Sequence, residues 1–212
     1  MIKGVIFDFD GVIANTLDFI FKEIINFSRH FNVKNLKEKQ IIEKIRQSNY
    51  KDLFKKFQIN WLKLPIILFL IKRAQYRLFE QIDDIRPFPK IKKLLNFLKK
   101  NQYLVFLVSS NIRKNIDRFL EINQLNVFDN IYTSNNFFGK DKIFLEILKK
   151  YRLKKEEVVY IGDELRDLQA TKKAGIKFIG VSWGLARKKV FQENRADFIV
   201  KNPDEIIKII SS

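Results

Sequence analysis

Cysteine is absent from the 212-residue chain. The chain therefore has no disulfide framework, no thiolate metal site and no cysteine nucleophile, and its composition suits a reducing compartment. No signal-peptide pattern precedes the first apolar stretch, because Met1 to Gly4 runs directly into it. These two features together predict a cytoplasmic protein.

Long apolar runs and flexible linkers are also missing. The longest apolar run, residues 64–71, is far shorter than the ~20 residues that span a bilayer, so no membrane partner is expected. The chain shows no repeat, low-complexity tract or Gly/Ser-rich linker. With 46% hydrophobic residues, it is long enough for one α/β domain with a large core and an inserted subdomain.

Acidic residues are scarce beside basic ones: 24 against 41, which gives a net charge of +17. Such a charge attracts polyanions, including nucleic acid. The lysines, however, are spread over nearly every expected helix, as on solvated faces, and form no single tract. This distribution argues against a nucleic-acid site. The spread is visible in the pairs Lys92-Lys93, Lys99-Lys100, Lys149-Lys150, Lys154-Lys155, Lys172-Lys173 and Lys188-Lys189.

Six stretches of β type are expected to be strands, and three of them end in polar residues. They lie at residues 5–7, 103–108, 130–132, 158–161, 177–181 and 198–200. Helical periodicity follows most of them, at residues 112–123, 142–151, 165–174 and from 203 onward. This alternation predicts an α/β fold with a doubly wound, Rossmann-like parallel sheet covered on both faces.

Residues 17–85 break the alternation. Apolar side chains such as Ile20 and Ile24 recur there at helical spacing, without a convincing strand. This pattern predicts a small all-helical bundle inserted after the first strand. The expected division is a core domain of residues 1–16 and 86–212 and a helical domain of residues 17–85.

Asp8 and Asp10 directly follow the first expected strand. In an extended chain residues i and i+2 point to the same side, so both carboxylates can converge beyond the sheet edge, where α/β sheets bind ligands. Gly11 allows the backbone a sharp exit. Two adjacent carboxylates repel, and a divalent cation with oxygen ligands relieves that repulsion. The alternative is an ordinary polar turn.

Residues 8–12, Asp-Phe-Asp-Gly-Val, resemble the first motif of haloacid dehalogenase (HAD) hydrolases. The resemblance implies that Asp8 is the nucleophile and a Mg²⁺ ligand. It implies that Asp10 is the general acid and base and offers its backbone carbonyl to the metal. It continues in order through three further motifs, and it makes residues 17–85 similar to a type-1 cap of the phosphoglycolate phosphatase-like branch.

The second motif is an apolar strand that ends in Ser109, followed by Ser110 and Asn111. A hydroxyl beside exposed amides at a helix start forms an anion site. The resemblance makes Ser109 a phosphate ligand, with the backbone N–H of Ser110 beside it. Alternatively, Ser110 or Asn111 caps the following helix, and both interpretations can hold together.

The third motif is one lysine, which neutralises charge on the nucleophile and the transferred phosphoryl group. Gly139-Lys140 resembles the family's Gly-Lys pair, although Asp141 stands where a proline is usual. Lys142 is the competing candidate. In a chain so rich in lysine, a solvated side chain is the alternative interpretation.

The fourth motif, Gly162-Asp163-Glu164-Leu165-Arg166-Asp167, resembles the family's Gly-Asp-x-x-x-Asp. Its two aspartates are four residues apart and lie on one face of a helical first turn. The resemblance makes them metal ligands. Alternatively, they stabilise the positive end of the helix dipole.

The four motifs together imply a Mg²⁺-dependent phosphatase that hydrolyses a small phosphorylated metabolite through an aspartyl phosphate on Asp8. The implied catalytic residues are Asp8, Asp10 and Lys140, with Ser109 and Ser110 on the phosphate. Two alternatives stay open. A phosphomutase has the same motifs, and a basic nucleic-acid-binding scaffold could carry them idle. The implied metal ligands are Asp8, Asp10, Asp163 and Asp167.

Overall fold

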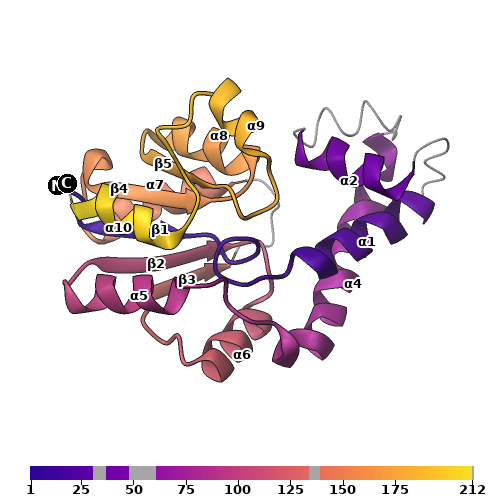
Figure 1. The fold of residues 1–212 in the computed structure, drawn as a ribbon, viewed down its shortest axis with the longest axis horizontal. Coiled ribbons are helices and arrows are strands. Elements are labelled where there is room, and N and C mark those ends of the chain that lie inside the picture. The colour runs from indigo at the N-terminus through magenta and orange to yellow at the C-terminus, as the bar shows by residue number, and fades with distance from the viewer. Residues whose placement is uncertain (31–36, 48–60, 134–138, 212) are drawn as a thin grey trace.

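The computed structural model describes residues 1–30, 37–47, 61–133 and 139–211 (Figure 1). Within these residues one sheet of parallel strands has the order β3-β2-β1-β4-β5-β6. The predicted α/β fold and its parallel sheet are confirmed, and the first strand lies inside the sheet. The strands are β1 (Gly4–Phe7), β2 (Leu104–Ser109), β3 (Asn130–Thr133), β4 (Val158–Gly162), β5 (Lys177–Val181) and β6 (Phe198–Val200).

Helices cover both faces of the sheet, because successive strand residues point to opposite sides. Val5 and Phe7 belong to one buried cluster and Ile6 to the other. The first cluster is closed by α5 (Ile91–Lys100), α6 (Arg113–Asn123) and α10 (Pro203–Ser211). The second is closed by α7 (Lys140–Lys150), α8 (Leu165–Ala174) and α9 (Lys188–Glu193).

One expected helix cap is wrong. Helix α6 has Ile112 as its N-cap, without a side-chain cap, so neither Ser110 nor Asn111 caps it. The Asn111 carboxamide instead receives the Ile112 N–H at 2.8 Å on its oxygen and turns its nitrogen toward Asp10. Ser110 and Asn111 are therefore not used as helix caps, and the Asn111 side chain contacts Asp10 instead.

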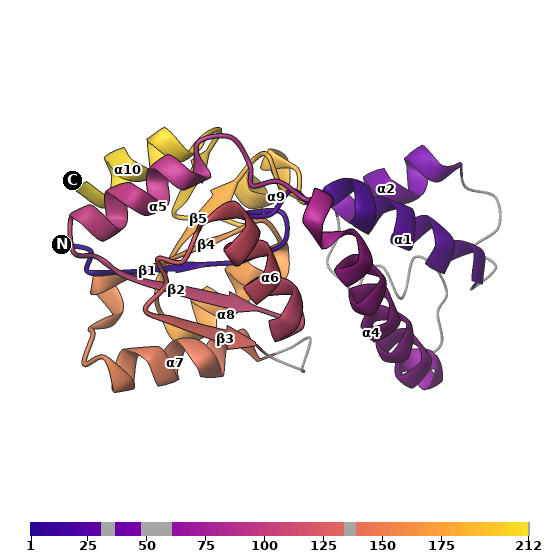
Figure 2. The same ribbon diagram turned by 90° about the horizontal axis from the view of Figure 1, so that it is seen from below.

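Beyond the carboxyl ends of the strands lie, within the described residues, the helices α1 (Leu17–His30), α2 (Glu38–Arg46) and α4 (Leu64–Gln81), with the short helices η1 (Trp61–Lys63) and η2 (Ile82–Asp84) (Figures 1 and 2). Parts of the expected cap, residues 31–36 and 48–60, lie outside the described residues. Leu78 of α4 and Ile82 of η2 are buried in the same cluster as Ile116 of α6. The base of this helical group is therefore seated on the sheet domain.

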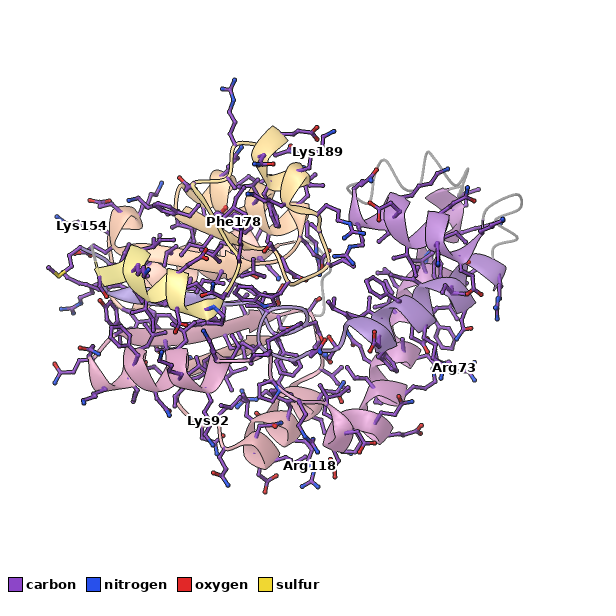
Figure 3. The ribbon with its side chains drawn as sticks, viewed as in Figure 1. Arg73, Lys92, Arg118, Lys154, Phe178 and Lys189 are labelled. Atoms are coloured by element: carbon purple, nitrogen blue, oxygen red, sulfur yellow. The ribbon has the colours of Figure 1, made fainter. Side chains whose placement is uncertain are left out.

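Charged side chains point outward on all sides of the molecule. Lys92 and Arg118 lie at the bottom of the view, Lys154 at the left and Lys189 at the top, whereas Phe178 lies inside (Figure 3). Among the described residues no helix is long and apolar enough to cross a membrane. The structure thus presents the positive charge as scattered groups.

Candidate active site

The ends of three neighbouring strands bring the first, second and fourth motifs together. Phe7 of β1 is paired with Leu107 of β2 and with Ile161 of β4. Each motif begins one or two residues further along, so Asp8, Ser109 and Asp163 leave the same edge of the sheet. The Asp8 N–H donates to the Ile161 carbonyl at 2.9 Å, which extends the β1–β4 ladder to Asp8 itself.

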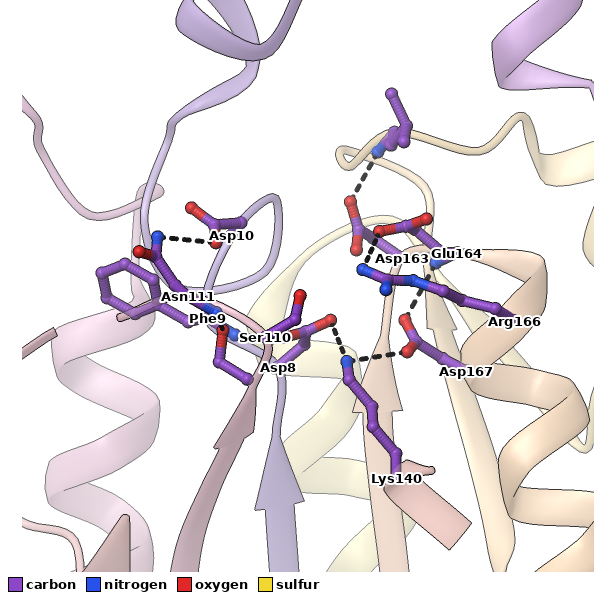
Figure 4. A network of polar contacts seen from close by, with 12 residues as sticks. Asp8, Phe9, Asp10, Ser110, Asn111, Lys140, Asp163, Glu164, Arg166 and Asp167 are labelled. Atoms are coloured by element: carbon purple, nitrogen blue, oxygen red, sulfur yellow. Dashed lines mark hydrogen bonds and ion pairs between the residues drawn. The ribbon is translucent and has the colours of Figure 1, made fainter. Parts of the chain in front are cut away.

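Lys140 lies at the centre of this edge. Its ammonium group, on a side chain with 6% exposure, is 2.6 Å from Asp8 Oδ2 and 2.8 Å from Asp167 Oδ1 (Figure 4). It also donates to the Tyr160 hydroxyl at 2.7 Å. Lys142, the competing candidate, is exposed. Gly139, at a φ of +121°, precedes α7, and the first residue of that helix, Lys140, is buried.

Three buried carboxylates surround a common point. One oxygen each of Asp8, Asp163 and Asp167 lies within 4.8 Å of the others. Asp163 Oδ2 accepts the Leu185 N–H at 2.8 Å, whereas Asp163 Oδ1 is buried without a partner among the described residues. Hard oxygen ligands of this kind suit Mg²⁺ or Ca²⁺. The residues present therefore fit the implied divalent metal.

Burial and neighbouring negative charges disfavour the ionised forms of Asp8 and Asp163. Burial raises the pKa of Asp8 to about 7, with Lys140 opposing and Asp167 adding to the shift. Burial, followed by the charges of Glu164, Asp8 and Asp167, raises the pKa of Asp163 well above its usual range. Lys140 supplies one positive charge, so a bound cation would favour the ionised forms of these groups.

Two glycines allow the loops to approach Asp163. Gly11 has a φ of +74°, and a Cβ there would lie 1.9 Å from Asp163 Oδ2. A Cβ on Gly184 would lie 2.2 Å from Asp163 Cβ. Only glycine fits at either position without displacing the carboxylate. The sharp exit that the sequence predicts at Gly11 is present.

Asp10 stands apart from the carboxylate cluster. Its Oδ1 accepts the Thr16 hydroxyl at 3.0 Å. Its Oδ2 accepts the Asn111 side-chain amide at 2.9 Å (Figure 4). Burial raises the pKa of Asp10, while the Asn111 and Thr16 hydrogen bonds oppose that shift. Its side chain is therefore oriented by hydrogen bonds, and metal binding by its backbone carbonyl stays a prediction.

The second and fourth motifs form the sides of the site. Ser109 is 1% exposed, and its hydroxyl accepts the Asn111 N–H at 3.0 Å, while Ser110 follows at the strand end. Asp167 Oδ2 also accepts the Glu164 N–H at 3.2 Å, so this aspartate lies at the positive end of α8 and stabilises it, as the alternative interpretation expects. Structural and chemical roles coexist at Asp167.

Some residues of the site have no signal in the sequence. The Tyr160 hydroxyl contacts Lys140, yet in the sequence Tyr160 is one residue of an apolar strand. Leu185 contributes its backbone N–H to the site, and it lies in a segment without a motif. Such groups are recognised only once the loops are placed in space.

Comparison with known proteins gives this arrangement a family. The model described as haloacid dehalogenase-like hydrolase matches residues 5–181, which include all four motifs. The chain belongs to the haloacid dehalogenase-like hydrolase family. The HAD resemblance of the motifs is thereby confirmed.

Relatives of this HAD hydrolase match along its whole length. A phosphoglycolate phosphatase of Synechococcus elongatus is 22% identical over 211 residues, covering 99% of this chain and 97% of the relative. The pyrophosphatase PpaX of Bacillus mycoides is 22% identical over 214 residues, with 99% and 97% covered. A solved structure of a predicted phosphatase from Clostridium acetobutylicum has a TM-score of 0.79 at 18% identity, covering 99% of both chains. That structural likeness shows the fold.

Proposed function

We propose that this chain, a HAD-type phosphoric monoester hydrolase, is a Mg²⁺-dependent phosphatase that acts through an aspartyl phosphate on Asp8. The observation that carries the proposal is the Lys140 ammonium group held between Asp8 and Asp167, beside the buried Asp163. A lysine and three carboxylates at one sheet edge suit a phosphoryl group in transfer. Relatives named as phosphatases support the same reaction class.

The reaction divides between Asp8 and Asp10. Asp8 attacks phosphorus, the bond from phosphorus to the leaving oxygen breaks, and Asp10 donates a proton to that oxygen. Asp10 then takes a proton from water as the water attacks phosphorus and the bond to Asp8 breaks. Lys140, Ser109 and the Ser110 N–H hold the phosphoryl oxygens. A Mg²⁺ ion held by Asp8, Asp163, Asp167 and the Asp10 carbonyl would neutralise charge on these groups.

The substrate proposed is a small phosphorylated metabolite, and we propose that residues 17–85 form the cap over the site. Helix α2 contacts the loop that carries Leu185. The Arg46 guanidinium donates to the Gly184 carbonyl at 3.2 Å, and the Arg46 backbone carbonyl accepts the Arg187 N–H at 3.1 Å. The same loop holds Asp163 through the Leu185 N–H. The proposed cap therefore contacts a segment that orders a proposed metal ligand.

The test is phosphate release from a panel of phosphorylated metabolites and an aryl phosphate, with Mg²⁺ and with a chelator. We expect turnover that chelation abolishes, and Asp8→Asn should reduce it by at least about 10³-fold because the nucleophile is lost. Asp18→Asn, at an exposed position of α1, is the matched control and should keep full activity. Undiminished turnover in Asp8→Asn would exclude Asp8 as the nucleophile. Product analysis separates released phosphate from the isomerised sugar phosphate of a mutase.

A further inference from the structure

A line of amides joins the proposed cap to Asp10. The Gln75 backbone carbonyl of α4 accepts the Asn115 side-chain N–H at 2.8 Å. The same Asn115 nitrogen donates to Asn111 Oδ1 at 2.8 Å, and Asn111 Nδ2 donates to Asp10 Oδ2 at 2.9 Å. We call Gln75, Asn115 and Asn111 the amide relay. It connects a cap helix to the proposed acid and base through three consecutive hydrogen bonds.

The relay fixes which end of the Asn111 carboxamide faces Asp10. Asn111 Oδ1 accepts hydrogen bonds from both Asn115 Nδ2 and the Ile112 N–H. If the Asn111 amide were flipped, its NH₂ group, which is a donor, would face these two donors. With Oδ1 held, Asn111 Nδ2 has to point at the Asp10 carboxylate. Asn115 therefore selects the orientation of Asn111.

Asn115 is a costly residue for its position. It is fully buried, at 0% exposure, and its Oδ1 has no partner within the part of the chain that the structure describes. A buried amide with an unsatisfied oxygen is less favourable than an apolar side chain of similar volume. Stability of α6 alone does not account for this choice, whereas orientation of Asn111 does.

We propose that Asn115 is a positioning residue that acts through Asn111 to aim Asp10 at the leaving oxygen of the substrate. This inference rests on the proposed phosphatase function. Because Asn115 also bonds to the Gln75 carbonyl, the orientation of Asp10 depends on the position of α4 against α6. A cap displaced from α6 loses the outer hydrogen bond of the relay, so the acid is correctly held only while α4 is docked.

Gln75 has a second, separable contact. Its side-chain Nε2 donates to the Ser110 backbone carbonyl at 2.8 Å, on the segment proposed to bind phosphate. The backbone carbonyl of Gln75 serves Asp10 and its side chain serves the phosphate segment. Substitution of the side chain therefore changes one branch and leaves the other in place.

The test compares leaving groups, because protonation matters only for poor ones. The kcat/KM reports the steps through formation of the aspartyl phosphate. In Asn115→Leu we expect kcat/KM to fall at least about tenfold for propyl phosphate and less than about twofold for dinitrophenyl phosphate, since a positioned general acid contributes about 10²- to 10⁴-fold. Asn123→Leu is the control, because among the described residues the Asn123 side chain, on the same helix, donates only to the Phe119 carbonyl. Asn115→Ala serves as the second variant if leucine disturbs the fold.

Gln75→Leu should behave differently, with kcat/KM falling by the same factor for both esters, because the phosphate is common to them. Equal losses for both esters in a folded Asn115 variant, or no loss, would overturn the inference while leaving the phosphatase function intact. Absence of any phosphate release by the wild-type protein would overturn the function and the inference with it.

Discussion

At the scale of single residues, burial of Asp8 links the charge of the site to the stability of the fold. Its pKa of about 7 exceeds the ordinary value of 3.8, so the folded metal-free protein holds an extra proton between these pH values. The free energy of unfolding therefore decreases as pH rises through this window. Ionisation of Asp8 is thus unfavourable to the folded state until a cation is bound.

Asp8→Asn should reveal this as a pH-dependent gain in stability. With a chelator present, we expect equal melting temperatures for variant and wild type at about pH 3 and below, where the carboxyl is mostly protonated in both folded and unfolded chains. At about pH 8 the variant should melt a few degrees higher. Differential scanning calorimetry across this range measures the effect. A constant difference at all pH values would contradict the assignment.

Residues that depend on distant partners could not be predicted from the sequence. Asp8, Asp10, Lys140, Asp163 and Asp167 follow strands or begin helices in a recognisable order, and the structure gathers them at one edge. Asn115 and Gln75, by contrast, lie within amphipathic helices where an amide suggests a solvated face. Their meaning depends on how α4 packs against α6, and no local pattern encodes that contact.

At the scale of elements, strands were more predictable than helix starts. Buried parallel strands are nearly continuous apolar runs, so all six were located to within about two residues. Helix α8 ends at Ala174, with Gly175 as its C-cap at a φ of +77°, and Asn202 Oδ1 accepts the Asp204 N–H at the start of α10. The start of helix α5 had no signal in the sequence, because Lys90 precedes it in a left-handed conformation and provides no polar cap.

The packing of the end of α4 against α6 determines how much of the proposed cap can be removed. Leu78 and Ile82 are 3% and 1% exposed within the core cluster, so replacing all of residues 17–85 would uncover α6. A linker in place of residues 20–72 keeps these side chains and Gln75. We expect this protein to stay soluble and to hydrolyse a small aryl phosphate in part, while preference among metabolites collapses.

The measurement is kcat/KM for the aryl phosphate and for each metabolite, after calorimetry has verified a cooperative melting transition. A protein lacking residues 17–85 entirely is the comparison and should aggregate, because the α6 surface is apolar. Full discrimination among metabolites by the folded linker protein would show that the sheet domain recognises the leaving group.

At the scale of the whole molecule, a net charge of +17 without clustering predicts weak binding to nucleic acid. Lys92, Lys154 and Lys189 point in different directions, so few can contact one duplex together (Figure 3). We expect binding at low salt that disappears by about 150 mM, measured by fluorescence anisotropy with duplex and single-stranded probes. A length-specific complex that persists at high salt in Asp8→Asn would favour a binding protein instead.

The sheet order also determines what happens while the chain is being made. Strand β1 leaves the ribosome before the other strands of the sheet. Gly4 pairs with Leu104 and Val158, so its second partner is synthesised about 150 residues later. At ~5–20 residues per second, this interval lasts on the order of ten seconds. During that time Val5, Ile6 and Phe7, each 0% exposed in the finished fold, have no sheet to enter. The newborn chain should therefore be a substrate for ribosome-associated chaperones until β4 emerges.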